Sequence, residues 1–350
     1  MTELEDRIRA ALQDPRWALA AWPEPMSRVR RAAARRRARL AAAPLALLAV
    51  VVAPLALLPG LSGPSVPSWV NRLHGEVAYK CGDRICLMRP DGTGKRTLTA
   101  TNPEWDPSWS PDGRRLSFRG YYGLGDGQYD LYAIDANGCH LTRLTHRMNG
   151  TSSSWSPTGQ QIVFSVPLGI YVINADGTGL RRLIASVSRY SYGVDTPAWS
   201  VRNRIAYARY LPSQHRTEIY TVNADGSGNA SLTRDAPGFV QPSWSPDGIS
   251  IAFVDETIPL QQAGIIEVAR ADGTGIHRVS PPGWTSYSPT WTPGGQIVFL
   301  RQIGSPTQID AGPTNAYIVN RDGSGLRLLY PDLGASQIAW GPTALPRPIC

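Results

Sequence analysis

Residues 152–184 read SSSWSPTGQQIVFSVPLGIYVINADGTGLRRLI, and this stretch contains the pattern that decides the fold. Trp155 ends a short extended run, and the Ser-Pro-Thr-Gly sequence after it is typical of a tight turn. Gln161–Ser165 and Ile170–Asn174 are rich in β-branched and aromatic residues, as strands are. The Asp176-Gly177 turn then leads into a fourth extended run. The stretch therefore predicts one small sheet of four antiparallel strands.

The same pattern recurs along the chain at a nearly constant interval. The repeated tryptophans stand 46, 44, 45, 47 and 49 residues apart, at Trp109, Trp155, Trp199, Trp244, Trp291 and Trp340. The second turn alternates with them, at Asp91-Gly92, Asn137-Gly138, Asp176-Gly177, Asp225-Gly226, Asp272-Gly273 and Asp322-Gly323. A period in the forties indicates repeated sheet units. Packing six of them radially buries their apolar faces, with each tryptophan between blades, so we expect an all-β, six-bladed β-propeller.

The two ends of the repeat region contain complementary parts of one unit. The chain enters with only the second, third and fourth strands, at Glu76–Lys80, Ile85–Arg89 and Arg96–Thr99. It ends with a lone first strand at Ser336–Trp340. Pairing this last strand with the first three completes a sixth blade and removes the open sheet edge. We therefore predict a ring closed by its two ends.

The repeated phrases resemble those of a known family. SWSPDG occurs at Ser108–Gly113 and Ser243–Gly248, and NADGTG occurs at Asn174–Gly179, with IVF and IYV between the turns. These phrases resemble the TolB-like, WD40-like (PD40) β-propeller repeat over roughly residues 76–342. The resemblance implies the propeller fold and is poorly specific for function. The α/β domain that precedes the propeller in TolB is not recognisable, and an apolar segment stands in its place.

That apolar segment, residues 40–61, has the length of a membrane-spanning helix. No charged residue occurs between Leu40 and Asn71, and about 20 apolar residues suffice to cross a bilayer. Seven arginines lie between Arg28 and Arg39, so the positive-inside rule predicts a cytoplasmic N-terminus. A cleaved signal peptide is the alternative, but the polar region before it is too long and no Ala-x-Ala site follows.

The expected organisation therefore has five parts. These are a cytoplasmic basic tail (1–39), a transmembrane signal-anchor helix (40–61), a linker (62–75), the propeller (76–342) and a C-terminal tail (343–350). The protein is expected in the cell membrane as a single-pass protein with an extracytoplasmic propeller. Of the net charge of +8, the first 39 residues contribute +5, since they hold ten arginines and five acids. A basic tail beside a membrane explains this charge, so we expect no nucleic-acid partner.

Sequence motifs for catalysis or metal binding are absent. No G-x-S-x-G elbow occurs, only ten residues follow Trp340, and the five histidines form no H-E-x-x-H or Cys/His pattern. We therefore expect no enzyme activity, no cofactor and no metal. Asp255-Glu256 is the one adjacent carboxylate pair in the propeller. A hydrolase or lyase that uses carboxylates from two blades stays open as an alternative.

The four cysteines suggest disulfides in an extracytoplasmic domain. Cys81 and Cys86 bracket a predicted hairpin and are expected to pair. Cys139 and Cys350 form a second candidate pair, with four unrelated thiols as the alternative.

Function is expected where the repeats differ. The two turns within each unit lie at one end of a propeller, and the loops at the other end vary in length: Arg119–Gln128, Ala185–Asp195, Arg209–Thr217, Asp255–Gly264 and Arg301–Asn315. These variable segments and their flanks carry aromatic and arginine side chains, which are enriched in recognition surfaces. The candidate ligand-binding residues are Trp105, Tyr121, Tyr122, Arg189, Tyr190, Tyr192, Tyr210, Phe239, Trp284 and Tyr287. The alternative is that half of them pack beneath their own loops.

The most direct reading is a membrane-anchored module that binds a protein, peptide or cell-envelope ligand. A channel-mouth hydrolase or lyase is the second hypothesis, and a transmembrane sensor that couples outside binding to the cytoplasmic tail is the third. The identity of the ligand and the oligomeric state do not follow from the sequence, because one fold supports many functions.

Overall fold

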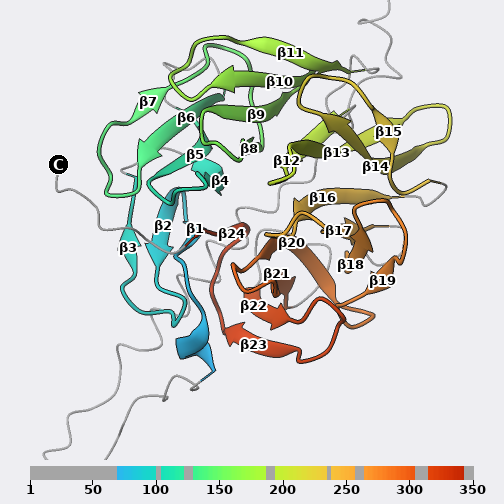
Figure 1. The fold of residues 1–350 in the computed structure, drawn as a ribbon. Coiled ribbons are helices and arrows are strands. Elements are labelled where there is room, and N and C mark those ends of the chain that lie inside the picture. Colours follow the sequence, from blue (N-terminus) through green and yellow to red (C-terminus); the bar gives the residue numbers. More distant parts are fainter. Residues whose placement is uncertain are drawn as a thin grey trace, which may run out of the picture. The chain divides into compact units, whose positions relative to one another are not determined.

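The computed structural model describes residues 69–99, 104–121, 129–186, 194–234, 238–256, 264–303 and 314–342. These residues form six separate antiparallel sheets of four strands each, arranged around a common centre (Figure 1). The predicted six-bladed β-propeller is confirmed.

Each blade is named here by its place in the chain. The closing blade contains β1 (Val77–Cys81), β2 (Arg84–Met88), β3 (Arg96–Thr97) and β24 (Ile338–Trp340). Blade 1 contains β4 (Glu104–Trp109), β5 (Arg115–Gly120), β6 (Asp130–Asp135) and β7 (Thr142–Arg143). Blade 2 contains β8 (Ser153–Trp155), β9 (Gln161–Val166), β10 (Gly169–Asn174) and β11 (Arg181–Ala185). Blade 3 contains β12 (Val194–Trp199), β13 (Arg204–Leu211), β14 (Arg216–Asn223) and β15 (Ala230–Ser231). Blade 4 contains β16 (Phe239–Trp244), β17 (Ser250–Asp255), β18 (Ile265–Arg270) and β19 (His277–Arg278). Blade 5 contains β20 (Thr285–Trp291), β21 (Ile297–Gln302), β22 (Thr314–Val319) and β23 (Arg327–Tyr330).

The two ends of the propeller meet in the closing blade. β24 pairs antiparallel with β1, so that Trp340 lies opposite Val77 and Ile338 lies opposite Tyr79. The pairing continues past β24, where Gly341 N donates to Glu76 O at 2.8 Å. Figure 1 shows the red-brown β24 beside the blue β1 at the start of the ring. The predicted sharing of one blade by both ends is therefore observed.

The core lies between neighbouring blades. The second strand of each of blades 1 to 5 places one aromatic side chain with no solvent exposure into this core: Phe118, Phe164, Tyr207, Phe253 and Phe299. Such side chains bury a large apolar area, and aromatic and β-branched residues fit the pleated sheet well. The apolar residues of these strands thus lie against the adjacent sheet.

Three of the repeated tryptophans, Trp155, Trp244 and Trp291, connect their blade to the preceding blade by an indole hydrogen bond, whereas Trp199 Nε1 donates to Asn203 of its own blade. Trp155 Nε1 donates to Ser108 O at 3.2 Å, Trp244 Nε1 to Ala198 O at 3.2 Å, and Trp291 Nε1 to Ser243 O at 2.9 Å. Each acceptor is the residue just before the tryptophan of the preceding blade. A single side chain thus contributes both buried ring area and a specific hydrogen bond across the interface.

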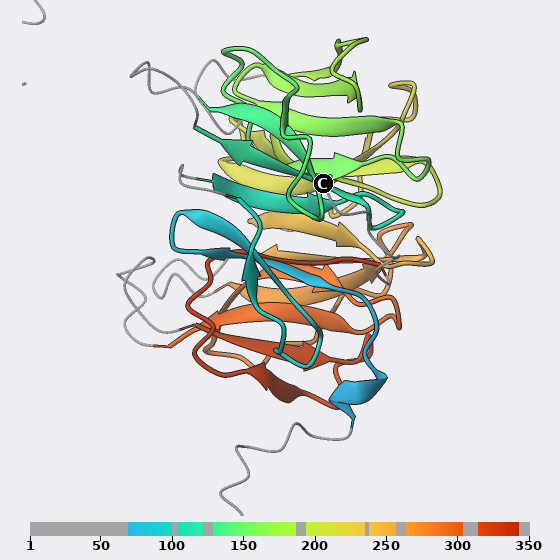
Figure 2. The ribbon, with the colours of Figure 1, turned by 90° about the vertical axis from the view of Figure 1, so that its left-hand side faces the viewer.

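The ring has two different ends. Every first strand runs toward the short turns between strands, and we call this the regular-turn end. The opposite end, where the second strands finish, carries the loops of unequal length, and we call it the variable-loop end. The chain enters the propeller at the regular-turn end, because His74 O accepts the indole N–H of Trp340 at 2.8 Å. There the short 3-10 helix η2 (Val70–Arg72) lies at the periphery of the ring (Figure 2).

The predicted anchor (40–61) and the two tails lie outside the described residues. Within the described part of the chain, no helix combines the length and the hydropathy that membrane crossing requires.

Removing β24 should open the ring. A chain truncated after Gly334 lacks the partner of β1 and exposes the edge of the closing blade, so we expect aggregation or loss of the cooperative thermal transition. A chain truncated after Pro342 is the matched control, since both variants lack Cys350 and only the first lacks β24. Equal, cooperative melting of the two would contradict closure by β24.

The interblade tryptophans should stabilise the fold, and a substitution that removes more of the side chain should cost more stability. Trp244→Phe keeps a large ring but leaves Ala198 O without its donor, and we expect a loss of about 1 kcal/mol in the free energy of unfolding. Trp244→Ala also empties a buried site and should cost about 3–5 kcal/mol. Urea unfolding measures both values, and a neutral Trp244→Ala variant would contradict the packing role.

Candidate functional site

A polar channel runs through the centre of the ring. It encloses about 340 Å³ and is lined by residues of the first strand of every blade. The residues three positions before each repeated tryptophan are all polar, and we call them the polar ring: Asp106, Ser152, Thr196, Gln241, Ser288 and Gln337. A second layer, one position before each tryptophan, is small: Ser108, Ser154, Ala198, Ser243, Thr290 and Ala339. The channel thus presents hydrogen-bonding groups nearer its variable-loop end and a layer of small residues nearer its regular-turn end.

A proline in four of the first strands shapes the polar ring. Four ring residues have left-handed backbones: Asp106 (φ 57°), Thr196 (φ 49°), Gln241 (φ 53°) and Ser288 (φ 54°). Each precedes a proline, and each lies where the strand pairing shifts register. In blade 2 and the closing blade, Ser153 and Ile338 replace the proline, and the pairing stays in register. Proline lacks an N–H for the ladder, so it favours a bulge, and the bulge re-aims the residue before it.

Side chains satisfy the backbone groups that the bulges release. Gln337 Oε1 accepts the N–H of Asp106 at 2.7 Å, and Gln241 Oε1 accepts the N–H of Ser288 at 2.8 Å. In both pairs the glutamine belongs to the preceding blade. Left-handed non-glycine residues are strained and persist only where their surroundings hold them, and such positions cluster at functional sites.

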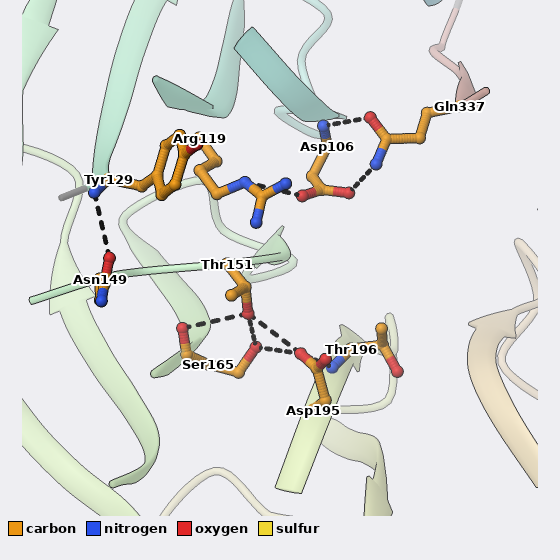
Figure 3. Close-up of polar contacts among 9 residues, drawn as sticks. All are labelled: Asp106, Arg119, Tyr129, Asn149, Thr151, Ser165, Asp195, Thr196 and Gln337. Carbon is orange, nitrogen blue, oxygen red and sulfur yellow. Dashed lines mark hydrogen bonds and ion pairs between the residues drawn. The ribbon is translucent and has the colours of Figure 1, made fainter. Parts of the chain in front are cut away.

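Asp106 is the one ionisable member of the polar ring. Its carboxylate bonds to Gln337 Nε2 and lies 3.4 Å from Arg119 Nε, and its side chain is only 18% exposed (Figure 3). Burial raises the pKa of Asp106 to about 6, with Asp195 also raising it and with Arg119 and Lys80 acting in the opposite direction. Asp106 can therefore change its charge near neutral pH inside the channel.

Beside Asp106, aromatic and cationic side chains form a group at the variable-loop end that we call the mouth cluster: Lys80, Trp105, Arg119, Tyr121 and Tyr129. Lys80 Nζ lies 5.4 Å and the Arg119 guanidinium carbon 5.0 Å from the centre of the Trp105 ring. Tyr129 meets Trp105 edge-on at 5.2 Å and lies 5.8 Å from Tyr121. Cation–π contacts of this length hold the rings and charges in a fixed arrangement.

Asp195 forms the adjacent corner of the site. Its Oδ1 accepts hydrogen bonds from Ser165 Oγ at 2.7 Å, from Thr151 Oγ1 at 3.0 Å and from the N–H of Thr196 at 2.7 Å (Figure 3). These donors come from blades 2 and 3, so the carboxylate joins two blades. Neutral hydrogen-bond donors thus hold Asp195, whereas Asp106 also has a cationic partner in Arg119.

A buried aspartate behind the cluster supports the loop that positions Tyr129. Asp130 accepts the N–H groups of Arg147 at 3.1 Å and Met148 at 3.2 Å and pairs with Arg143. Although burial raises the pKa of Asp130, these hydrogen bonds and the ion pair bring it below its usual value. Two residues beyond Arg147, Asn149 Oδ1 accepts the N–H of Tyr129 at 3.2 Å.

The structure brings together only some of the predicted site residues. Trp105 and Tyr121 belong to the mouth cluster. Tyr122, Arg189, Tyr190 and Tyr192 lie outside the described residues. Tyr210 lies near the end of β13, where its hydroxyl is 3.4 Å from His215 Nδ1.

The other three predicted residues pack within the fold. The prediction of Phe239 as a ligand-binding residue is corrected by the structure. Its side chain is 4% exposed, and its ring centre lies 4.7 Å from that of Phe253, so Phe239 belongs to the core and is not part of the candidate site. The guanidinium carbon of Arg301 lies 3.7 Å from the centre of the Trp284 ring, and the centres of the Trp284 and Tyr317 rings are 4.7 Å apart. Tyr287 is half-buried against the core between blade 5 and the closing blade.

The polar ring, Lys80, Arg119 and Tyr129 are not among the site residues predicted from the sequence. That prediction rests on positions where the repeats differ, whereas the polar ring is a position that is polar in all six repeats. The constant offset of three residues before each tryptophan was the available signal.

Two of the expected disulfide cysteines are joined next to Lys80. Cys81 and Cys86 form a disulfide across the β1–β2 hairpin, with their Cα atoms 5.8 Å apart. Cys139 is also disulfide-bonded, and its expected partner, Cys350, lies outside the described residues.

Comparison with known proteins shows similarity to TolB. No family model matches the chain. It is 26% identical over 217 residues to the Tol-Pal system protein TolB of Francisella tularensis subsp. tularensis, which covers 59% of this chain and 48% of that protein. It is 27% identical over 182 residues to the uncharacterized protein Atu1656 of Agrobacterium fabrum, which covers 49% of this chain and 61% of that protein. The match thus spans less than two thirds of either relative.

Solved structures show the same fold. TolB from Acinetobacter baumannii superposes with a TM-score of 0.62 at 17% identity, covering 77% of this chain and 67% of that one. A putative TolB from Agrobacterium tumefaciens superposes with a TM-score of 0.56 at 18% identity, covering 76% and 92%. The chain therefore contains a TolB-like six-bladed β-propeller.

The raised pKa of Asp106 predicts a specific pH dependence of stability. Because the folded protein holds this proton more tightly than the unfolded chain, the stabilisation is complete below the unfolded pKa of about 3.9 and is lost as pH rises through about 6. Asp106→Asn cannot ionise and should not lose stability in this window. We expect the unfolding free energy of the variant to improve relative to wild type between pH 4 and pH 8. Parallel profiles in urea unfolding would show that Asp106 does not titrate there.

Proposed function

We propose that this chain is a membrane-anchored, extracytoplasmic β-propeller that binds a protein, peptide or cell-envelope ligand at the variable-loop end of its channel. The observation that carries the proposal is the meeting of the mouth cluster and the polar ring at that end. Aromatic and arginine side chains in part-buried positions are typical of binding hot spots.

The mouth cluster has the chemistry of a recognition surface. Lys80 lies over Trp105 and makes no ion pair among the described residues, so its charge is available to a ligand. The polar ring offers amide and hydroxyl groups one layer deeper in the channel. A ligand segment that covers the rings and reaches into the channel would use both.

The cellular setting is supported by independent features. A disulfide at Cys81–Cys86 suits an oxidising compartment. Residues 40–61 have the composition of a signal anchor, and the arginine-rich stretch before them favours a cytoplasmic N-terminus. The similar TolB proteins are Tol-Pal system proteins, which agrees with an envelope role.

An acid–base enzyme is the second candidate, and Asp106 is the observation that favours it. A channel carboxyl with a pKa of about 6, coupled to a second carboxylate at Asp195, has the chemistry of a general acid or base. The described residues contain no group of three metal-ligating side chains. Comparing the mass of a captured ligand after incubation with wild type and with Asp106→Asn distinguishes catalysis from binding.

The binding proposal predicts that one end of the ring is required for capture. The Lys80→Gln, Trp105→Ala double variant of the full chain should lose at least tenfold in ligand capture from detergent-solubilised envelope extracts. Its melting temperature should stay close to that of wild type, because both side chains lie at the rim of the core.

A matched control exists at the other end of the molecule. Arg327 lies 5.1 Å from the ring centre of Trp69 at the regular-turn end, and so repeats the cation–aromatic pairing. The Trp69→Ala, Arg327→Gln variant should capture the ligand normally. Normal capture by the first variant, or equal loss in both, would contradict the proposed binding end.

A further inference from the structure

A second pocket lies at the regular-turn end, between blades 3 and 4. It encloses about 350 Å³ and is lined by Ser200, Arg202, Arg204, Trp244, Gly248, Ile249, Arg270, Ala271 and Asp272. Three arginines and one aspartate leave a formal surplus of two positive charges around this one cavity. The corresponding pocket between blades 1 and 2 has a single arginine, Arg115, and one aspartate, Asp176.

None of the three arginines is paired with a carboxylate in the described part of the chain. Arg202 Nε donates to Asp247 O at 3.0 Å, which leaves its terminal nitrogens unused. Arg204 is held by Thr221 Oγ1 and by Ala271 O, the latter at 3.4 Å. The guanidinium of Arg270 makes no hydrogen bond or ion pair among the described residues. A surplus of cations in a concave site attracts an anion.

The neighbouring carboxylates are already engaged. Asp272 Oδ1 accepts the N–H of Thr274 at 2.9 Å and its hydroxyl at 2.7 Å. Asp247 is bonded to Arg321 at 2.7 Å and to Ser245 Oγ at 2.5 Å. Asp247 is thus paired with Arg321, outside the three arginines of the pocket. Asp272, on which Arg270 also acts electrostatically, is the one aspartate already counted against the surplus of two positive charges.

Local backbone geometry keeps the pocket open. Gly248 has φ +67°, and a Cβ at this position would lie 3.0 Å from Arg202 Cγ. A side chain there would therefore press on the arginine stem and enter the cavity. The glycine lets the turn of blade 4 approach Arg202 of blade 3 without filling the space between them.

We propose that this pocket binds a phosphate group, through the guanidinium forks of Arg202 and Arg270 and the charge of Arg204. Guanidinium groups bind phosphate in a bidentate manner, and a surplus of two positive charges matches a phosphate better than a single carboxylate. The cavity lies at the lower end of the size range of small-ligand pockets. This site is distinct from the channel and does not depend on the function proposed for it.

The phosphate could belong to a soluble ester or to a lipid headgroup, and two exposed side chains separate these sources. Val201 and Ile249 stand beside the arginines and are 56% and 44% exposed. Both residues lie in the turn between the first and second strands of their blades, at the regular-turn end where the chain enters the propeller. A lipid would place its headgroup in the pocket and apolar carbons against these two side chains.

The test uses the full chain in a neutral detergent and three probes: inorganic phosphate, glycerol 3-phosphate and dihexanoyl phosphatidylglycerol below its micelle concentration. Calorimetric titration should show one saturable site, and the Arg202→Gln, Arg270→Gln variant should bind at least tenfold more weakly. The matched control is Arg89→Gln, Arg114→Gln, which changes the net charge by the same amount. Arg89 is the equivalent of Arg270 in the closing blade, and Arg114 is an arginine in the turn between the first and second strands of blade 1. It should bind as wild type does.

Each outcome decides the proposal. If the lipid binds at least tenfold more tightly than glycerol 3-phosphate, and Val201→Ser, Ile249→Ser removes this gain, the phosphate is that of a lipid. Equal affinities identify a soluble phosphate ester. No saturable binding of any probe, or an equal loss in both arginine double variants at unchanged melting temperature, would overturn the site.

Discussion

The hydrogen bonds between β24 and β1 are the constraint on which the rest of this structure depends. They join residues more than 250 positions apart, Trp340 with Val77 and Ile338 with Tyr79, and turn a row of sheets into a ring. Each sheet can then bury both faces against neighbours, and indole hydrogen bonds from Trp155, Trp244 and Trp291 join three of the pairs of adjacent blades. A closed ring also gives six strands a common axis, which creates the channel.

The channel illustrates how a local sequence feature becomes a site. A proline two residues before a repeated tryptophan interrupts the strand ladder and leaves the preceding residue in a left-handed conformation. Four strands share this feature, and glutamines from neighbouring blades satisfy two of the released N–H groups. Asp106 is one of these four strained residues, and its burial also raises its pKa. The strained backbone positions and the carboxyl group with the raised pKa therefore belong to the same layer of the channel, the polar ring, next to the mouth cluster.

Much of the fold could be predicted from the sequence, because the repeat carries it. The spacing of the tryptophans and the incomplete units at the two ends were sufficient for the blade number and the closing pair. The site was harder to predict. Trp105 and Tyr121 were found by their residue types, but Phe239 has the same type and lies in the core. Arg119 lies opposite Trp105 in the β4–β5 pair of blade 1, and Lys80 reaches the same indole from the closing blade. The Lys80 contact depends on packing between two blades, and no spacing along the chain reveals it.

We propose different roles for the two ends of the ring, with ligand recognition at the variable-loop end. In-cell photo-crosslinking tests this assignment most directly. A photoreactive phenylalanine analogue is placed either at Tyr121, in the mouth cluster, or at Leu180, which is 47% exposed at the regular-turn end. The account predicts a discrete crosslinked protein or envelope adduct from position 121 and none of the same mass from position 180. The same adduct from position 180 alone would contradict it.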